Sequence, residues 1–464
     1  MNRWLFLFIL IPFTLFGEGL DFTELWKQIE ENSSERKAKY LLWKAGEIAR
    51  DRSDRHFLPR VYTDLRSFQT NDPALNFLGK LGQRSATDSD FSTASTRVRP
   101  GNFLDQNNQP HTGLNSDSIN LIAKDNLNYP GSNIYSRGTL GVDLPLYEGG
   151  SSTAMASMME KRSAGLKHEW LFIRDREFAQ AGFYYRSVQS LREFKNRLET
   201  IHKIEARFQS NYSLRNKGNP VGYSGFLALK SLKNQIKVYN NTVDLQITDY
   251  LNTLQILSNL TNTDLNFKEI ELDPFLEQYF PLNSEYERSQ VINAQLKYAE
   301  VDKLKSDVEM SKFLPKIGVY SEAYAYQGSR NFANAYQAGV YVQMNLYSPK
   351  EIGSVEEAKL NAEASFKLIQ EKAKAEELHL TTLKIKERSQ RENLDLLRET
   401  YRFQEEQVSN IQKLFQSGAA SAIQFAEVLN RTLEVSKYLM ESEIAYLQTR
   451  TEISLYTKKD NSNE

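Results

Sequence analysis

The sequence of 464 residues contains no cysteine at all. This absence excludes disulfides, thiolate metal sites and cysteine nucleophiles, and it removes the residue to which a bacterial lipid anchor is attached. A chain without thiols is typical of an exported protein that avoids unwanted oxidation.

An excess of charge of either sign is also lacking, because 58 Lys and Arg residues face 59 Asp and Glu residues, for a net charge of −1. Bulk charge therefore gives no reason to expect a nucleic-acid partner. The mean hydropathy of −0.56 indicates a polar chain with much wet surface. Its length suffices for two or three ordinary domains or for one elongated domain.

Catalytic motifs are missing too. The sequence has no P-loop and no G-x-S-x-G segment, and its histidines lack a spacing such as H-E-x-x-H. We therefore predict no catalytic residue, no metal site and no cofactor, and we expect that the protein is not an enzyme. The five histidines, each interpreted as an ordinary solvated side chain, are His56, His111, His168, His202 and His379.

Long hydrophobic runs are confined to the N-terminus. Arg3 precedes an apolar run over residues 4–16, and Gly17 and Gly19 fit a small-x-small cleavage site, so residues 1–19 are predicted to be a signal peptide. The run is shorter than the roughly 20 residues that a spanning helix needs. Since no later segment is as long, any insertion into a membrane must use strands.

The sequence contains an internal repeat. The phrase Phe-Leu-Pro followed by a basic residue occurs at 57–60 and again at 313–316, each time before alternating residues. Period-two alternation is the signature of a strand with one apolar face. It predicts two strand pairs, over 57–69 with 137–147 and over 315–327 with 337–347.

The two faces of these strands differ in polarity. The alternation is weak over 57–69, but apolar residues share one face of each of the other three predicted strands, and the opposite face of 315–327 carries Tyr320, Glu322, Tyr324 and Tyr326. Both an outer-membrane barrel and a soluble sandwich would give this pattern. Four strands cannot close a barrel alone, since even small ones have about eight, and bare edges in lipid cost several kcal/mol per unpaired group. A barrel would therefore need several chains. The predicted apolar positions are Leu140, Val142, Leu144, Leu146, Ile317, Val319, Ala323, Ala325, Ala338, Val340, Val342, Met344 and Leu346.

A long helix is predicted after each strand pair, over about 151–209 and about 351–416, because both stretches lack proline. At 1.5 Å per residue each would be about 90 to 100 Å long. The segment 384–393 has Ile385 as its one strong apolar residue, so its apolar seam is narrow. Such a helix requires coiled-coil neighbours. Shorter helices are expected to return to about 259 and 456.

The repeat gives a domain plan. We expect a first repeat over 20–260, a linker or equatorial region over 261–283, a second repeat over 284–457 and a polar tail over 458–464. The first repeat contains a long insertion, 70–136, rich in Asn, Ser, Thr, Asp and Gly, whose length indicates a functional loop or disorder. The hairpin tips, where each long helix turns back, are predicted at 212–224 and 417–421.

These phrases are also those of a known family. The sequence resembles the TolC-like outer-membrane efflux proteins, the outer membrane factors, through both Phe-Leu-Pro phrases, "LPLYEGG" at 144–150 and "SGAAS" at 417–421. Residues 71–91 look like an insertion found in one branch of the family. The resemblance implies an α+β membrane protein and a homotrimer. Each chain would give four strands to a twelve-stranded barrel and its helices to a coiled-coil periplasmic tunnel. It places the insertion 70–136 outside the cell.

The function that the resemblance implies is a passive channel-tunnel in the outer membrane of a Gram-negative-type bacterium. It would export small molecules or polypeptides from a tripartite efflux or type I secretion assembly, with a periplasmic adaptor and an inner-membrane pump as partners. The alternative from another class is an exported coiled-coil scaffold that spaces the envelope layers without transport. The strands of such a scaffold would need no lipid-facing alternation.

The resemblance also suggests two sets of site residues. Small residues at the hairpin tips let another chain approach closely, although turns use the same residue types. Some family members have two acidic residues just after the second tip that narrow the tunnel, and here Gln424 and Glu427 occupy those positions, so one carboxylate is missing. A ring of Glu427 side chains would still favour cations; alternatively, Glu427 is an ordinary solvated residue. The predicted adaptor-docking residues are Gly218, Asn219, Pro220, Val221, Gly222, Gly418, Ala419, Ala420 and Ser421.

Overall fold

The computed structural model describes residues 19–87, 90, 107–109, 128–211, 218–259, 266–282 and 285–457. Nearly all of the predicted signal peptide, much of the predicted insertion and the predicted C-terminal tail lie outside the described residues. The chain divides into two compact units. One is built mainly from helices and comprises 1–48, 160–301 and 362–464; the other contains the strands and comprises 49–159 and 302–361.

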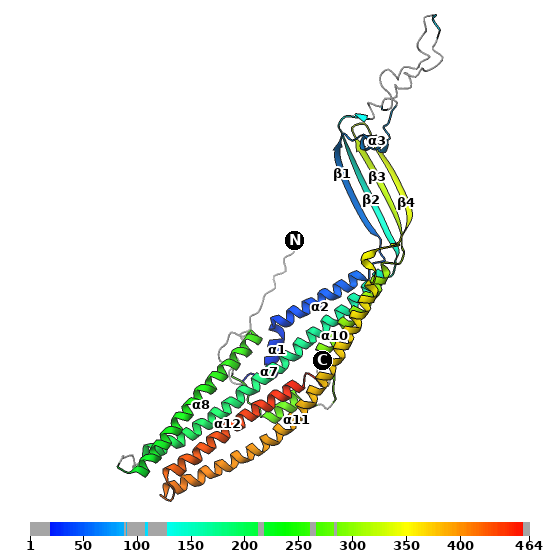
Figure 1. Cartoon of the computed structure of the whole chain (residues 1–464). Coiled ribbons are helices and arrows are strands. Elements are labelled where there is room, and N and C mark those ends of the chain that lie inside the picture. The colour runs from blue at the N-terminus through cyan, green and yellow to red at the C-terminus, as the bar shows by residue number, and fades with distance from the viewer. Residues whose placement is uncertain are drawn as a thin grey trace, which may run out of the picture. The chain divides into compact units, whose positions relative to one another are not determined.

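Two helical hairpins form the main body of the helical unit (Figure 1). Leu191, Leu229, Val408 and Leu429, one from each of four helices, belong to one buried core, so the two hairpins pack on each other. No proline interrupts these helices after their first turn, as such lengths require. The four helices are α7 (Ser151–Asn211), α8 (Pro220–Ser258), α11 (Ser354–Gln416) and α12 (Ala422–Ile453).

A second core in this unit is aromatic. Phe22 of one helix packs edge-on against Phe275 of another, with ring centroids 5.3 Å apart, and Tyr185 of α7 lies against both rings. Burial of such rings is worth about 1.5–3 kcal/mol each. This core fastens α1 (Phe22–Asn32) and α9 (Leu272–Tyr279) to the long helices. The other shorter helices are α2 (Ser34–Ser53), which has no buried residue, and α10 (Gln290–Ser311), whose Ile292 and Ala299 form a small separate core with Ile369 of α11.

The strand unit holds one antiparallel sheet in the order β1-β2-β3-β4. Pro59 and Pro315, which lack an N–H for the sheet ladder, immediately precede β1 and β3. The fourth strand begins at 332 and not at the predicted 337, because a tight turn, closed by Gly328 N–H donating to the Asn331 carbonyl, leads straight into it. The strands are β1 (Arg60–Thr70), β2 (Asn133–Glu148), β3 (Lys316–Gly328) and β4 (Phe332–Gln343).

The register separates the faces of the sheet as the alternation predicts. Val61 pairs with Val142 and Val319 pairs with Val340, so valines line up on one face. Leu146 lies at a bulge between β2 and β3, and Met344 and Leu346 follow the end of β4. The apolar face is exposed in the single chain; its exposed large members are Val61, Leu65, Ile134, Leu140, Val142, Val319, Phe332, Tyr336, Val340 and Val342.

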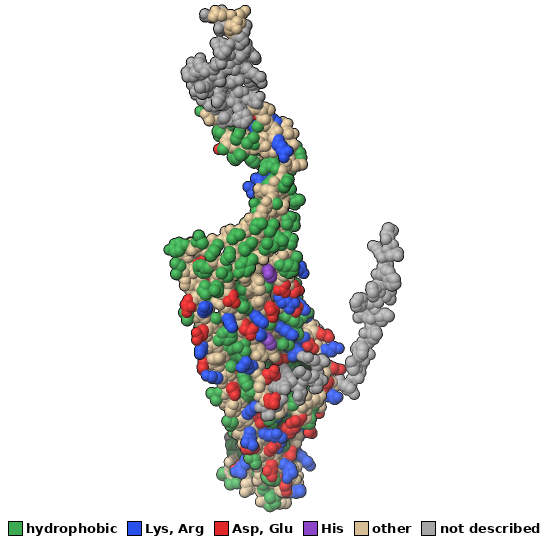
Figure 2. All heavy atoms as spheres, turned by 90° about the vertical axis from the view of Figure 1, so that its right-hand side faces the viewer, with side chains coloured by type: hydrophobic (Ala, Val, Ile, Leu, Met, Phe, Trp, Pro, Cys, Tyr) green, Lys and Arg blue, Asp and Glu red, His purple; other side chains and the backbone are tan. Residues whose placement is uncertain are grey.

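Charge is distributed accordingly. The helical unit carries acidic and basic side chains in close alternation, while the part of the surface over the strands shows mostly hydrophobic and uncharged side chains (Figure 2). In the described part of the chain, no helix is both long enough and apolar enough to cross a membrane.

Candidate functional site

Two surfaces stand out as candidates: the polar face of the sheet and the hairpin tips. On the polar face, Glu322 lies at the centre of a hydrogen-bond network. Its carboxylate accepts hydrogen bonds from the hydroxyls of Tyr62 and Tyr324 and from the amide of Gln337 at 2.5 Å. Four side chains from three strands thus form one hydrogen-bonded cluster on this face.

Basic side chains complete the polar face. The Arg137 guanidinium lies 4.4 Å from the centre of the Tyr324 ring, and Arg66 forms an ion pair with Asp64 at 2.7 Å. A guanidinium over an aromatic ring is attracted by the ring's quadrupole. The face therefore combines hydroxyls, carboxylates and guanidinium groups.

A short helix, α3 (Pro73–Gly82), covers part of this polar face. Gly79 lies against the ring of Tyr135 and Gly82 against the ring of Tyr326; a β-carbon at either glycine would come within 2.6 and 2.9 Å of them. Glycine therefore allows the helix to lie directly on the sheet. These residues belong to the predicted insertion 70–136, and their contact with the sheet was not predicted.

A polar residue anchors α3. Asn76, which is fully buried, donates to the carbonyl of Thr70 at 3.0 Å and accepts from Asn133 at 2.8 Å and from the Tyr135 hydroxyl at 2.9 Å. These contacts join the helix to the ends of β1 and β2. A buried amide with this many partners is well satisfied, and its loss would leave several groups unpaired.

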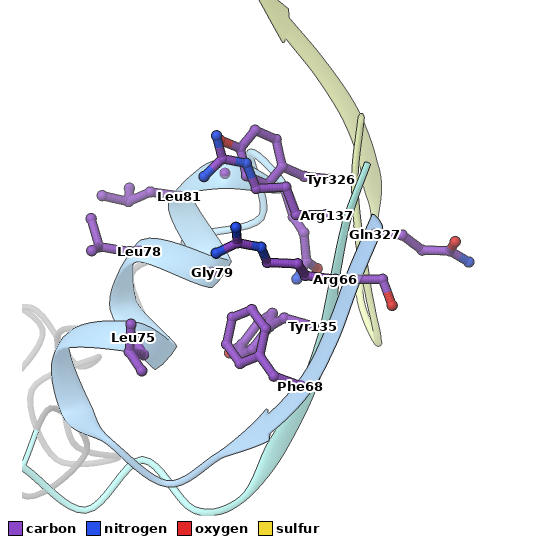
Figure 3. Close-up of a pocket in the computed structure, with 13 residues that line it drawn as sticks. Arg66, Phe68, Leu75, Leu78, Gly79, Leu81, Tyr135, Arg137, Tyr326 and Gln327 are labelled. Atoms are coloured by element: carbon purple, nitrogen blue, oxygen red, sulfur yellow. The ribbon is translucent and has the colours of Figure 1, made fainter. Parts of the chain in front are cut away.

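A pocket of about 490 Å³ remains between α3 and the sheet (Figure 3). Arg66 and Arg137 extend from the strands toward the helix, with Phe68 below them. Leu78 and Leu81 also line the pocket, from the side of the helix that faces away from the sheet. The pocket thus offers two guanidinium groups beside aromatic and aliphatic side chains. This chemistry suits an amphipathic molecule that carries an anionic group.

An ion-pair clamp fixes the segment after α3. The buried carboxylate of Asp90 contacts Lys80 at 2.9 Å and Arg330, in the β3–β4 turn, at 2.6 Å, and it accepts from Thr87 N–H at 2.9 Å. Burial by itself would raise the pKa of Asp90, but the bonds from Arg330 and Lys80 outweigh it and hold that pKa well below its usual range. Asn331 adds a bond to the Gln83 carbonyl at 3.0 Å. The segment after α3 is therefore tied to the β3–β4 turn.

The first hairpin tip is described from Gly218 onward. Asn219 is the N-cap of α8, and its side chain accepts from the N–H of Gly222 at 3.1 Å. Pro220 occupies the first position of the helix, where no N–H is needed. Val221 is exposed. All five predicted docking residues therefore lie together at the start of α8, and the cap alone accounts for Asn219 and Pro220. Residues 212–217 of this predicted tip lie outside the described residues.

The second tip is fully described. Gly418 has φ of +80°, a left-handed conformation that favours glycine, and the N–H groups of Ala419 and Ala420 both donate to the Leu414 carbonyl. Ser421 then caps α12. The four predicted docking residues form a compact turn in which no large side chain intervenes between the backbone and solvent.

The predicted aperture residues have local partners. Gln424 completes a capping box: its side-chain oxygen accepts from Ser421 N–H at 2.9 Å, while Gln424 N–H donates to the Ser421 hydroxyl at 3.3 Å. Glu427 forms an exposed ion pair with Arg431 at 2.6 Å. Both residues lie on the exposed surface of the first turns of α12, and a basic group accompanies the one carboxylate.

An aromatic cluster and a buried acid lie behind the tips. Phe208 packs on Phe425 with ring centroids 4.8 Å apart, so α7 and α12 meet beneath the turns. Glu205, one turn before Phe208, is fully buried, and neither of its carboxylate oxygens has a hydrogen-bond partner of good geometry. Burial raises the pKa of Glu205, while nearby His202 and Lys233 oppose the shift without cancelling it.

The histidines form no site in the part of the chain that the structure describes, and no cluster of three or more potential metal ligands occurs there. His168 contacts Gln290 at 2.7 Å, His379 contacts Glu452 at 2.8 Å, and His56 lies 3.0 Å from the Ser53 carbonyl. Each is part of a local polar contact. His111 lies outside the described residues.

No protein-family model matches the sequence, and no curated protein matches it either. Several solved structures, however, are similar to this chain over most of its length. The chain superposes on CusC with a TM-score of 0.69, covering 98% of this chain and 99% of that one, at 10% identity. The CmeC outer membrane channel of Campylobacter jejuni gives 0.67 over 95% and 87%, at 10% identity. The open-state MtrE outer membrane channel of Neisseria gonorrhoeae gives 0.71 over 94% and 88%, again at 10% identity.

These similarities extend over nearly the whole chain, including both the helical and the strand unit. The predicted fold class, four strands per chain together with long paired helices, is therefore confirmed as the fold of these outer membrane channels.

Proposed function

We propose that this chain is a subunit of a passive channel in the outer membrane of a Gram-negative-type bacterium, a member of the outer membrane factors. Three copies form the channel, the strands make its barrel and the helices make a periplasmic tunnel. The fold shared with outer membrane channels supports this proposal. Small molecules or polypeptides would pass through it, moved by a pump in the inner membrane.

The sheet carries the proposal. Its apolar face is exposed, with Leu65 80% and Val340 68% accessible, and in the described part of the chain no further strand pairs with the outer edges of β1 and β4. An exposed apolar sheet with two open edges is unstable in water and in lipid. When other copies of the chain continue the sheet into a closed barrel, the open edges are paired and the apolar face can contact lipid.

The helical unit offers matching contact surfaces. Exposed apolar residues follow one line along α8 and another along α11, at intervals of about two or three turns, so each set lies on one side of its helix. Ile385, the lone apolar residue of its segment, belongs to the second line and is 68% exposed in the single chain. The stripes are Leu227, Val238, Leu245 and Ile256 on α8, and Leu378, Ile385, Leu396, Phe403 and Leu414 on α11.

These stripes lie on the second helix of one hairpin and on the first helix of the other, which differ in sequence. An interface between two different surfaces is repeated around a ring and closes when the rotation fits. Packing the α8 stripe of one copy on the α11 stripe of the next would give the trimer its second interface.

The hairpin tips serve as docking points for a periplasmic adaptor in this proposal. The turn at 417–421 presents backbone and small side chains, and Val221 at the other tip is exposed. Small residues allow a partner's backbone to approach closely. Gln424 and Glu427 lie next to this turn, where their copies would border the periplasmic opening.

The test is single-channel conductance of the full chain in a planar lipid bilayer, with the native mass measured on the same preparation. A trimer with discrete conductance steps is expected. A trimer closed at its tips would conduct after the tips are loosened by Gly418→Asp. A water-soluble monomer or dimer would instead support the envelope scaffold and reject the channel.

A further inference from the structure

The helix α3 lies on the polar face of the sheet, against Tyr135 and Tyr326. The opposite face carries Leu65 and Val340, which are exposed and apolar. If the apolar face meets lipid, as the proposed function requires, then α3 lies inside the barrel. We propose that three copies of α3 meet on the axis of the trimer and close its outer mouth with an apolar plug. This inference rests on the proposed function.

The dimensions of such a barrel support closure. Twelve strands about 4.8 Å apart, tilted by roughly 40°, give a barrel about 24 Å across between backbones. An α-helix with side chains is about 10 Å wide, and three helices side by side need a circle of about 22 Å. Because the inward side chains of the strands take up part of this width, three copies of α3 that lie on the wall must contact one another around the axis.

The exposed surface of α3 is suited to meet its own copies. Leu75, Leu78 and Leu81 follow a helical spacing, and all three are exposed in the single chain. Leu78 and Leu81 point away from the sheet (Figure 3), which in the barrel is toward the axis. Six leucines, two from each of three chains, would form one apolar cluster. Hydrophobic constrictions of this kind exclude water and block ion flow.

Polar contacts, and not a deep core, hold α3 in place. Of the residues that make up this helix, Asn76 alone is buried, and a pocket of about 490 Å³ is lined by residues of the helix and of the strands. The clamp formed by Asp90, Lys80 and Arg330 ties the far end of the segment to the β3–β4 turn. Release of this clamp would free the plug while leaving the sheet intact.

Cross-linking tests the plug on the full chain. Because the native sequence has no cysteine, Leu78→Cys introduces a single thiol per chain. A short bis-maleimide added to the detergent-solubilised trimer is expected to convert most of this variant to covalent dimers. The matched control is Leu65→Cys on the apolar face, where the barrel wall separates the thiols and the chain is expected to remain monomeric on a denaturing gel. Leu81→Cys is a second position with the same expected result.

The outcomes separate this inference from the proposed function. A native mass of a trimer without cross-links at 78 or 81 would overturn the plug while leaving the channel intact. A monomeric native mass would overturn both. Adding Arg330→Gln to Leu78→Cys is expected to lower the cross-linking rate several-fold; an unchanged rate would show that the clamp does not hold the plug.

Discussion

Phe415 and Phe425 stack with their ring centroids 5.0 Å apart and their planes within 5° of each other. The two rings come from the end of α11 and the start of α12, so they join the helices directly behind the second hairpin tip. Offset aromatic pairs add about 0.5–1.5 kcal/mol beyond the area they bury. The packed rings therefore hold the ends of α11 and α12 together directly behind the turn at 417–421, which favours a fixed conformation of the proposed docking surface.

Removal of the inner ring should loosen this tip. Phe425 is fully buried, so Phe425→Ala is expected to cost about 3–5 kcal/mol of local stability through the lost burial and the cavity. Limited proteolysis of the purified protein should then cut faster at 417–421. Ile423→Ala, two residues earlier and exposed, is the control and should leave the cleavage rate unchanged. Equal cleavage of both variants would show that the aromatic pair does not support the tip.

The α11 stripe predicts which surface substitution breaks the trimer. Ile385→Asp places a charge on the proposed interface in all three copies and should shift the native mass from trimer to monomer, because burying an unpaired carboxylate is costly. Lys386→Asp introduces the same residue at the neighbouring exposed position, on another side of the helix, and should leave the trimer intact. Native mass spectrometry distinguishes the two results. A stable trimer of Ile385→Asp would remove this stripe from the interface.

Local patterns predicted the sheet well. Strand alternation depends only on neighbouring residues, and the predicted separation of Val319 from Tyr320 and of Val340 from Tyr341 is found in the register. Strand ends depend on turn geometry, so the start of β4 at Phe332 was not predicted. The helix α3 had readable signals, with Asp72 as N-cap and Pro73 at the first helical position. Its place on the polar face could not be read from sequence, because contacts far apart in the chain determine it.

Two side-chain contacts at the second tip also follow from local sequence. The segment Ser421-x-x-Gln424 is a capping box in the sequence, and Arg431 follows Glu427 by four residues, so both local partners could have been predicted. Neither partner was predicted: Gln424 and Glu427 were interpreted as aperture residues, with an ordinary solvated side chain as the alternative for Glu427. The buried state of Glu205, by contrast, depends on packing among α7, α8 and α12 that no local pattern reveals.

Glu205 predicts a pH dependence of stability. Because burial raises its pKa in the folded chain, the unfolded chain loses this proton first as the pH rises. The free energy of unfolding therefore has its full value below the pKa that Glu205 has in the unfolded chain. It declines as the pH rises toward the pKa that Glu205 has in the folded chain. Glu205→Gln should raise the melting temperature at about pH 7 and change it little at about pH 4, near the unfolded pKa. The exposed Glu199→Gln is the control. An equal gain at both pH values would exclude ionisation as the cause.

The last prediction concerns ion selectivity at the periplasmic opening. Gln424→Glu restores a second acid beside Glu427 and preserves the capping box, since glutamate also accepts from the N-cap backbone. If three copies of these residues border the opening, the added carboxylates should raise the preference for cations, measured as the reversal potential in a salt gradient across a planar bilayer. Arg431→Gln should act in the same direction by removing the partner that lies 2.6 Å from Glu427, and Glu427→Lys should act in the opposite direction. Lys413→Gln, on the other side of the turn, is a charge-matched control. Unchanged selectivity in all three variants would place these residues away from the narrowest part of the conduit, with the turn at 417–421 retaining only its docking role.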